Sequence, residues 1–213
     1  MPATFAFGQP QKAAIEIGKK IKEVRMFYKR LVNLISFLLV VALLSSCSLL
    51  ITIPHYKWDI SLQQPIPSDT LVYSDEFIKI NFTVGEKQIS FDMQNKTDKG
   101  MKINWDEISY ISPTGMSMRI IHGGVRLIDR NAPQAPTIVP PNSRISDFII
   151  PSENIYYVSG EYGGWRESDL FYNENKAIYE GKEFSVYMPL EIKSERKEYT
   201  FTFRINKVTK VEK

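Results

Sequence analysis

The residues of this chain that could carry chemistry are few and scattered. The sequence has two histidines, His55 and His122, and a single cysteine, Cys47. A zinc site usually takes three or four histidine, cysteine or carboxylate ligands at short spacings. His122 has neither a cysteine nor a second histidine at such a spacing, so the sequence predicts no metal site. Nothing else in it indicates a cofactor.

Motifs for catalysis are equally sparse. Ile121–Gly124, I-H-G-G, is similar to the oxyanion loop of some esterases, but the G-x-S-x-G motif of their nucleophile is missing. We therefore interpret it as the end of a strand followed by a glycine turn. The acids of Asp106–Glu107 and Ser168–Asp169 lie near tryptophans and could join a glycan or Ca²⁺ site, although solvated turn acids are the more common case. We predict no catalytic residue and no enzyme activity.

The single cysteine lies near the end of an apolar run, in the stretch Val41–Leu50, VALLSSCSLL. The uncharged segment Leu31–Ile53 is long enough to cross a bilayer at about 1.5 Å per residue. Lys29 and Arg30 precede it, and positive charge keeps that side of such a segment in the cytoplasm. The residues that follow are therefore expected outside the cytoplasm.

Leu44-Ser45-Ser46-Cys47 resembles the lipobox of bacterial lipoproteins: an aliphatic residue, two small residues and the cysteine that receives a diacylglyceryl group. The resemblance implies a signal peptide at 26–46, cleavage between Ser46 and Cys47, and attachment of acyl chains (palmitate among them) to Cys47. It also implies a cell-envelope location facing out of the cytoplasm. With Ser48 after the cysteine, it implies the outer membrane if the organism has two. The alternative is an uncleaved helix at 31–53 in the inner membrane.

The balance of charge also changes at Cys47. Residues 1–46 contain seven Lys or Arg and two acids, which leaves twenty basic and twenty-two acidic residues from Cys47 onward. The nearly neutral remainder gives no reason to expect nucleic acid as a partner. Residues 1–25 form a basic extension in which Ile17, Ile21 and Val24 have helical spacing. The extension is either a short amphipathic helix or an artefact of a start at Met26.

The exported part has the period-two alternation of β-strands. No long segment in it has helical periodicity, so we predict an all-β fold: an immunoglobulin-like antiparallel sandwich, or alternatively a lipocalin-like β-barrel. Pro189 has no N–H, which places its strand at a sheet edge or at a bulge. The side chains expected in the core are Phe91, Ile103, Trp105, Val186, Phe201 and Phe203. The strands are expected at 77–84, 89–94, 101–106, 116–120, 184–192 and 199–205.

Three segments are predicted to lie outside the strands. Trp58–Thr70 contains two prolines and is interpreted as part of a tether at 47–70, ahead of a β-sandwich domain at 71–213. Arg130–Asn142 is rich in proline, and Ser159–Glu167 combines glycines with aromatic residues. Loops on a rigid scaffold are common recognition sites, so Tyr162, Gly163, Gly164 and Trp165 form a candidate binding loop. The alternative is that Trp165 folds back onto the core.

Asn95–Pro151 resembles a module of uncharacterised bacterial envelope lipoproteins. The resemblance implies a β-sandwich and no particular activity. We therefore expect a lipid-anchored, non-catalytic binding or assembly domain whose partner is an envelope protein or a glycan. The alternatives are a structural subunit of a secretion or surface complex and an enzyme acting on an envelope polymer.

Overall fold

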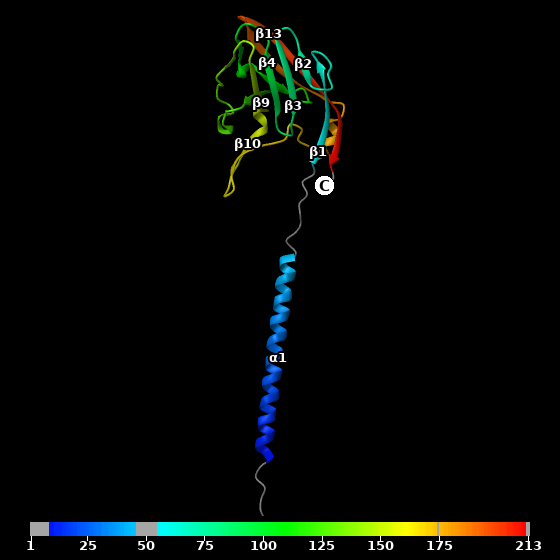
Figure 1. Ribbon diagram of the computed structural model, residues 1–213, viewed down its shortest axis with the longest axis vertical. Helices are drawn as coiled ribbons and strands as arrows, with labels where there is room; N and C mark the ends of the chain where they lie inside the picture. The colour runs from blue at the N-terminus through cyan, green and yellow to red at the C-terminus, as the bar shows by residue number, and fades with distance from the viewer. Residues whose placement is uncertain (1–8, 46–54, 174, 212–213) are drawn as a thin grey trace, which may run out of the picture. The chain divides into compact units, whose positions relative to one another are not determined.

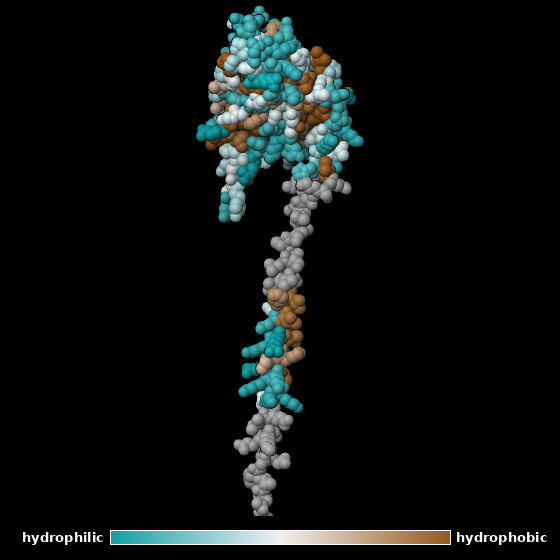
Figure 2. Space-filling model, viewed as in Figure 1, coloured by the Kyte–Doolittle hydropathy of each residue, from teal (hydrophilic) through white to brown (hydrophobic). Residues whose placement is uncertain are grey.

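The computed structural model describes residues 9–45, 55–173 and 175–211. Two units divide the chain, one within residues 1–53 and a β unit within 54–213. In the first unit, helix α1 (Gln9–Ser45) runs through the described part of the basic extension and the proposed signal peptide. Within residues 18–39, whose side chains the structure describes, hydrophilic side chains lie toward the N-terminal side and apolar side chains follow (Figure 2). Among the described residues, no helix has the length and apolar character that a membrane crossing needs.

The β unit is antiparallel throughout its described residues (Figure 1). Eleven strands form one sheet in the order β1-β13-β12-β6-β7-β9-β4-β3-β2, with β5 paired to β12 and β8 paired to β5, while β10 and β11 form a separate hairpin. The sheet curves almost into a barrel around one core, which confirms the predicted all-β class. The strands are β1 (His55–Gln64), β2 (Val72–Ser74), β3 (Ile78–Val84), β4 (Ile89–Asn95), β5 (Met101–Ile103), β6 (Ser109–Ile111), β7 (Ser117–His122), β8 (Thr137–Val139), β9 (Arg144–Pro151), β10 (Ile155–Val158), β11 (Gly164–Glu167), β12 (Glu183–Ile192) and β13 (Glu195–Val211).

Alternation along the strands places the apolar side chains in the core. Successive side chains of a strand point to opposite faces, so one face of each strand can be buried as a set. All six side chains predicted to be buried are buried, and their aromatic members pack against further rings from β3 and β12. The ring centroid of Phe82 lies 4.8 Å from that of Phe201 and 5.1 Å from that of Phe203. The core thus links β3 to β13 across the unit.

The predicted tether is wrong from His55 onward, because β1 begins there. This strand pairs with β13 from His55 opposite Val211 to Gln64 opposite Thr202, with two irregularities in the register. Leu62 is fully buried. Apolar and polar residues alternate poorly along β1, and prolines follow it, so the sequence pattern was interpreted as a linker. The β unit therefore begins close to His55, not at residue 71.

Pro189 does not lie on an edge strand, which was one of the two places that the sequence predicted for it. Strand β12 is interior, with β13 on one side and β5 and β6 on the other. The register with β13 runs on through Pro189. On the other side, Tyr187 is the last residue paired with β6, and Leu190 is the first paired with β5. The 3-10 helix η1 (Trp105–Glu107) separates those two strands, so the missing N–H of proline falls at a break between them.

Both predicted loops contain a strand. Arg130–Asn142 includes β8, which pairs with β5. Ser159–Glu167 includes β11, which returns along β10, so the glycine-rich segment is the turn and second strand of a hairpin. Gly163 closes this turn: its N–H donates to the Gly160 carbonyl at 2.9 Å, and a Cβ there would lie 2.6 Å from the Val158 oxygen.

Candidate functional site

The predicted binding loop and the proline-rich segment lie against each other. The guanidinium carbon of Arg130, just after the 3-10 helix η2 (Leu127–Asp129), lies 4.8 Å from the centre of the Trp165 ring in β11. This is within the range of a cation–π interaction. The contact joins the proline-rich segment to the hairpin, although the sequence separates them by more than thirty residues.

A surface groove of about 620 Å³ runs along the proline-rich segment. The end of β7 and its glycine turn form one wall, and the chain leading into β8 forms the other. The groove is lined by His122, Gly123, Gly124, Val125, Arg126, Asp129, Ala132, Pro133, Gln134, Ala135, Pro136 and Thr137. We call this cavity the His122 groove.

His122 is held rigidly at the wall of this groove. Its Nδ1 lies 3.1 Å from Oδ2 of Asp147, on the neighbouring strand β9. Its ring stacks on Trp105, with centroids 3.9 Å apart and planes within 6°. The indole N–H of Trp105 in turn donates to Oγ1 of Thr137 at 2.9 Å. Three strands and η1 therefore fix the position of one imidazole ring.

The carboxylate of Asp147 sets the tautomer of His122. Its Oδ1 accepts the backbone N–H groups of Gly123 at 2.8 Å and Phe148 at 2.7 Å. A carboxylate placed as an acceptor for these donors also accepts Nδ1–H, and in the neutral form of the ring this leaves Nε2 as the acceptor. A Cβ at Gly123 would lie 2.7 Å from Asp147 Oδ1, so glycine allows the close approach.

Gln134 and Asp106 hold the opposite wall in place. The buried amide of Gln134 donates to the Ile120 carbonyl at 2.8 Å and accepts from the His122 N–H at 3.3 Å. Its backbone N–H donates to Asp106, whose carboxylate also pairs with Arg119. Asp106 is exposed, as expected of a turn acid, and these two contacts also give it a structural role.

The arrangement can accept a hydrogen bond from a ligand. In the described part of the chain, Asp147 is the one hydrogen-bond partner of the His122 ring, and no serine, threonine or cysteine is bonded to it. Nucleophilic catalysis would need such a group beside the base. No group of three or more His, Cys, Asp or Glu side chains among the described residues could hold a metal ion.

The predicted binding loop divides into an exposed tip and a half-buried base. Tyr162 is 86% exposed at the tip. Trp165 is half-buried and packs against a second small cluster of Ile121, Ile150 and Ile155, apart from the main core. Its ring centroid lies 5.5 Å from that of Tyr157 on the paired strand. Trp165 therefore attaches the hairpin to the β unit without entering the main core.

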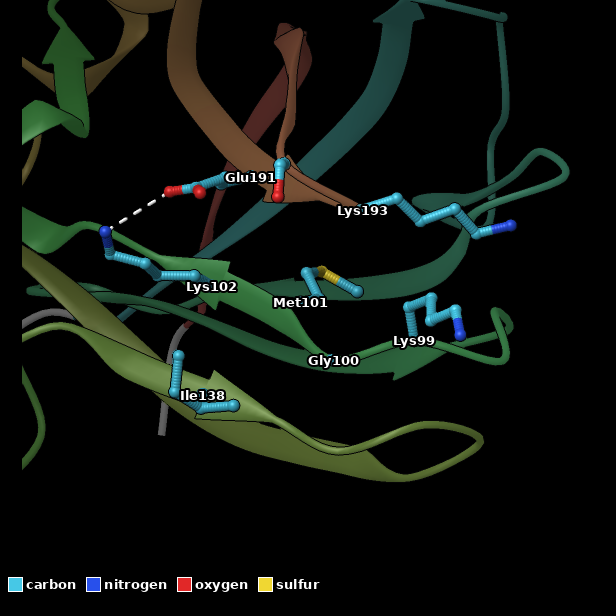
Figure 3. Close-up of a pocket in the computed structure, with 8 residues that line it drawn as sticks. Lys99, Gly100, Met101, Lys102, Ile138, Glu191 and Lys193 are labelled. Carbon is cyan, nitrogen blue, oxygen red and sulfur yellow. Dashed lines mark hydrogen bonds and ion pairs between the residues drawn. The ribbon is translucent and has the colours of Figure 1, made fainter.

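A second cavity, of about 500 Å³, lies between β5, β8 and the β12–β13 turn (Figure 3). Three lysines line it, which suggests an anion site. However, the Lys102 ammonium pairs with Glu191 at 3.2 Å, and Lys193 pairs with Asp98 at the same distance. These partly exposed ion pairs compensate the charge, so the cavity is a weaker candidate than the His122 groove.

Ser46 and Cys47 lie outside the described residues, so the lipobox stays a prediction. Comparison with protein-family models and with curated proteins finds no match to this chain. One solved structure, of a protein from Archaeoglobus fulgidus, is similar over 66% of this chain and 98% of its own length. The sequences are 11% identical and the TM-score is 0.27.

Proposed function

We propose that this protein is a cell-envelope lipoprotein, anchored through acyl chains on Cys47, whose β unit binds a partner without catalysis. Support for the anchor comes from the sequence Leu44-Ser45-Ser46-Cys47 after a basic and apolar leader. Several acyl chains hold a protein at a membrane far more firmly than one chain does. With Ser48 next, the outer membrane is the proposed location in a two-membrane organism.

The anchor is tested by Cys47→Ala in cells fed a labelled fatty acid. We expect the wild-type protein to take up label and lose residues 26–46, because the acylated cysteine becomes the N-terminus. The variant should take up no label and keep its leader. Ser48→Ala is the matched control and should be processed as wild type. An intact mass that retains residues 26–46 in the native protein would instead favour the uncleaved helix.

The observation that carries the binding role is the His122 groove. Its walls are fixed by hydrogen bonds, and the neutral ring of His122 offers a pre-oriented acceptor beside exposed Pro133, Ala135 and Pro136. A rigid groove loses little conformational entropy on binding, which favours recognition of a partner. We propose that an envelope protein or a glycan with a hydrogen-bond donor occupies it.

Photo-crosslinking in cells tests this assignment. A photoreactive amino acid at Ala135, in the groove, should capture a discrete partner, whereas the same residue at exposed Thr200 on β13 should not. His122→Ala should then weaken the capture at Ala135. Equal capture from both positions would contradict the groove as the binding site. Retention on immobilised envelope polysaccharide, lost in His122→Ala, would identify a glycan.

A further inference from the structure

The β10–β11 hairpin exposes aromatic side chains that no core explains. Tyr156, Tyr157 and Tyr162 are 47%, 60% and 86% exposed, and Val158 is exposed beside them. The hairpin is not part of the large sheet, and it projects beyond the rest of the β unit (Figure 1). Exposed aromatic residues gathered on a projecting element suggest a contact surface.

The hairpin lies at the end of the β unit where the chain enters. His55, the first residue of β1, has its Nδ1 3.7 Å from the carboxylate of Glu86. The backbone carbonyl of Glu86 accepts the N–H of Leu170 at 2.8 Å, three residues after β11 ends. Both the start of β1 and the base of the hairpin therefore contact the β3–β4 turn, and Figure 1 shows them at one end of the unit.

The proposed anchor keeps this end close to the membrane. His55 lies eight positions after Cys47 in the sequence. A chain of that length spans at most about 29 Å, whatever its conformation. The His55 end of the β unit is thus held within that distance of the lipid surface, and the hairpin projects from the same end.

The chemistry of this end suits a lipid surface. Tyrosine and tryptophan concentrate at membrane–water interfaces, where the ring lies among apolar groups and the polar atom stays hydrated. Exposed Lys57 and Lys210, near the paired ends of β1 and β13, add positive charge that attracts anionic headgroups. Glu161 at the hairpin tip opposes burial in hydrocarbon, so contact is expected at the headgroup level.

We propose that the β10–β11 hairpin rests on the same membrane that holds Cys47, with its tyrosines at the level of the lipid headgroups. This inference rests on the proposed lipid anchor. The acyl chains hold the protein, and the hairpin adds a second contact that fixes the tilt of the β unit. A fixed tilt gives the His122 groove a constant orientation toward its partner.

The test uses the acylated mature protein in vesicles of phosphatidylethanolamine and phosphatidylglycerol. Cys47 is the only native cysteine and its sulfur is blocked by the lipid, so one introduced cysteine can be labelled alone with an environment-sensitive fluorophore. Ser159→Cys places the label in the hairpin turn and keeps every tyrosine. Glu195→Cys, at the opposite end of β13 from Val211, is the matched control.

We expect the label at position 159 to shift its emission to the blue in vesicles and to lose its quenching by aqueous iodide. The label at 195 should keep the emission wavelength and the iodide quenching that it has in the protein without vesicles. Adding Tyr156→Ser and Tyr162→Ser should reverse the blue shift of the label at 159 and restore its quenching by iodide. Tyr157 is kept because it contacts Trp165, and an unchanged melting temperature will show that the hairpin still folds.

The two proposals fail in distinguishable ways. Protein that does not float with the vesicles overturns the anchor, and the hairpin proposal falls with it. Protein that floats but leaves position 159 as accessible to iodide as position 195 overturns the hairpin proposal alone. A shift at 159 that requires envelope proteins in the vesicles would also overturn it, because the hairpin would then bind a protein.

Discussion

Asn95, at the end of β4, shows how a single buried side chain joins three segments. The two hydrogens of its amide nitrogen are shared among the carbonyls of Lys99 at 2.8 Å, Val139 at 3.1 Å and Pro140 at 3.0 Å. Its oxygen accepts the backbone N–H of Thr97 at 3.0 Å and the hydroxyl at 2.8 Å. Asn95 thereby connects β4 and its turn to the end of β8.

We predict that Asn95→Ala lowers the free energy of unfolding by about 3 kcal/mol, because it leaves several buried polar groups of the backbone unpaired. Asn81→Ala, at an exposed position on β3, should change it by less than about 0.5 kcal/mol. Urea unfolding of both variants provides the measurement. Equal effects at the two positions would show that the buried hydrogen bonds contribute little.

Sequence reasoning succeeded for core residues and failed for residues such as Asn95. Period-two alternation identifies Phe201 and Ile103 as buried, because burial of a strand face repeats along the chain. Trp105 is also buried as predicted, but it lies in η1, because the strand expected at 101–106 ends at Ile103. A polar turn residue looks the same in a sequence whether it is buried or solvated. The pairing of His122 with Asp147 depends on the neighbouring positions of β7 and β9, which no local pattern reports.

At the level of elements, the pairing of β1 with β13 closes one end of the large sheet. Strand β13 pairs with β12 over residues 195–204 and with β1 over residues 202–211. Ile60 and Leu62 of β1 contribute buried side chains to the core. The register shifts after Asp59 and after Leu62, so the strand does not alternate cleanly. This irregularity explains why sequence reasoning placed a tether there.

Removal of β1 should therefore lower the stability of the β unit far more than removal of a tether would. A protein that begins at Pro65 loses Ile60 and Leu62, and each buried aliphatic side chain contributes about 2–5 kcal/mol. It also leaves one edge of β13 unpaired. We expect such a protein to melt well below one that begins at Pro54, or to lose cooperative unfolding, as measured by circular dichroism. Equal melting temperatures would restore the tether interpretation.

At the scale of the whole molecule, two buried tyrosines couple stability to alkaline pH. The Tyr199 hydroxyl donates to Asp75 at 2.8 Å, and burial followed by this hydrogen bond raises its pKa above the ordinary value of 10.0. Burial also raises the pKa of Tyr110, whose hydroxyl has no hydrogen-bond partner among the described residues. Both side chains face the main core, so ionising either one opposes folding of the entire β unit.

The sign of the pH effect follows from the raised pKa values. Below pH 10 both tyrosines are neutral in the folded and unfolded chains, so their contribution to stability is fully present. Above pH 10 the unfolded chain releases protons that the folded protein retains, and stability falls by up to about 1.4 kcal/mol per pH unit for each tyrosine.

Tyr199→Phe cannot ionise and should remove one such contribution, at the cost of about 1 kcal/mol near neutral pH for the lost hydrogen bond. Urea unfolding between pH 8 and about pH 11 measures both effects, with exposed Tyr162→Phe as the control. A slope in Tyr199→Phe as steep as in the wild type would contradict the assignment, because the loss of stability would then come from groups elsewhere in the protein.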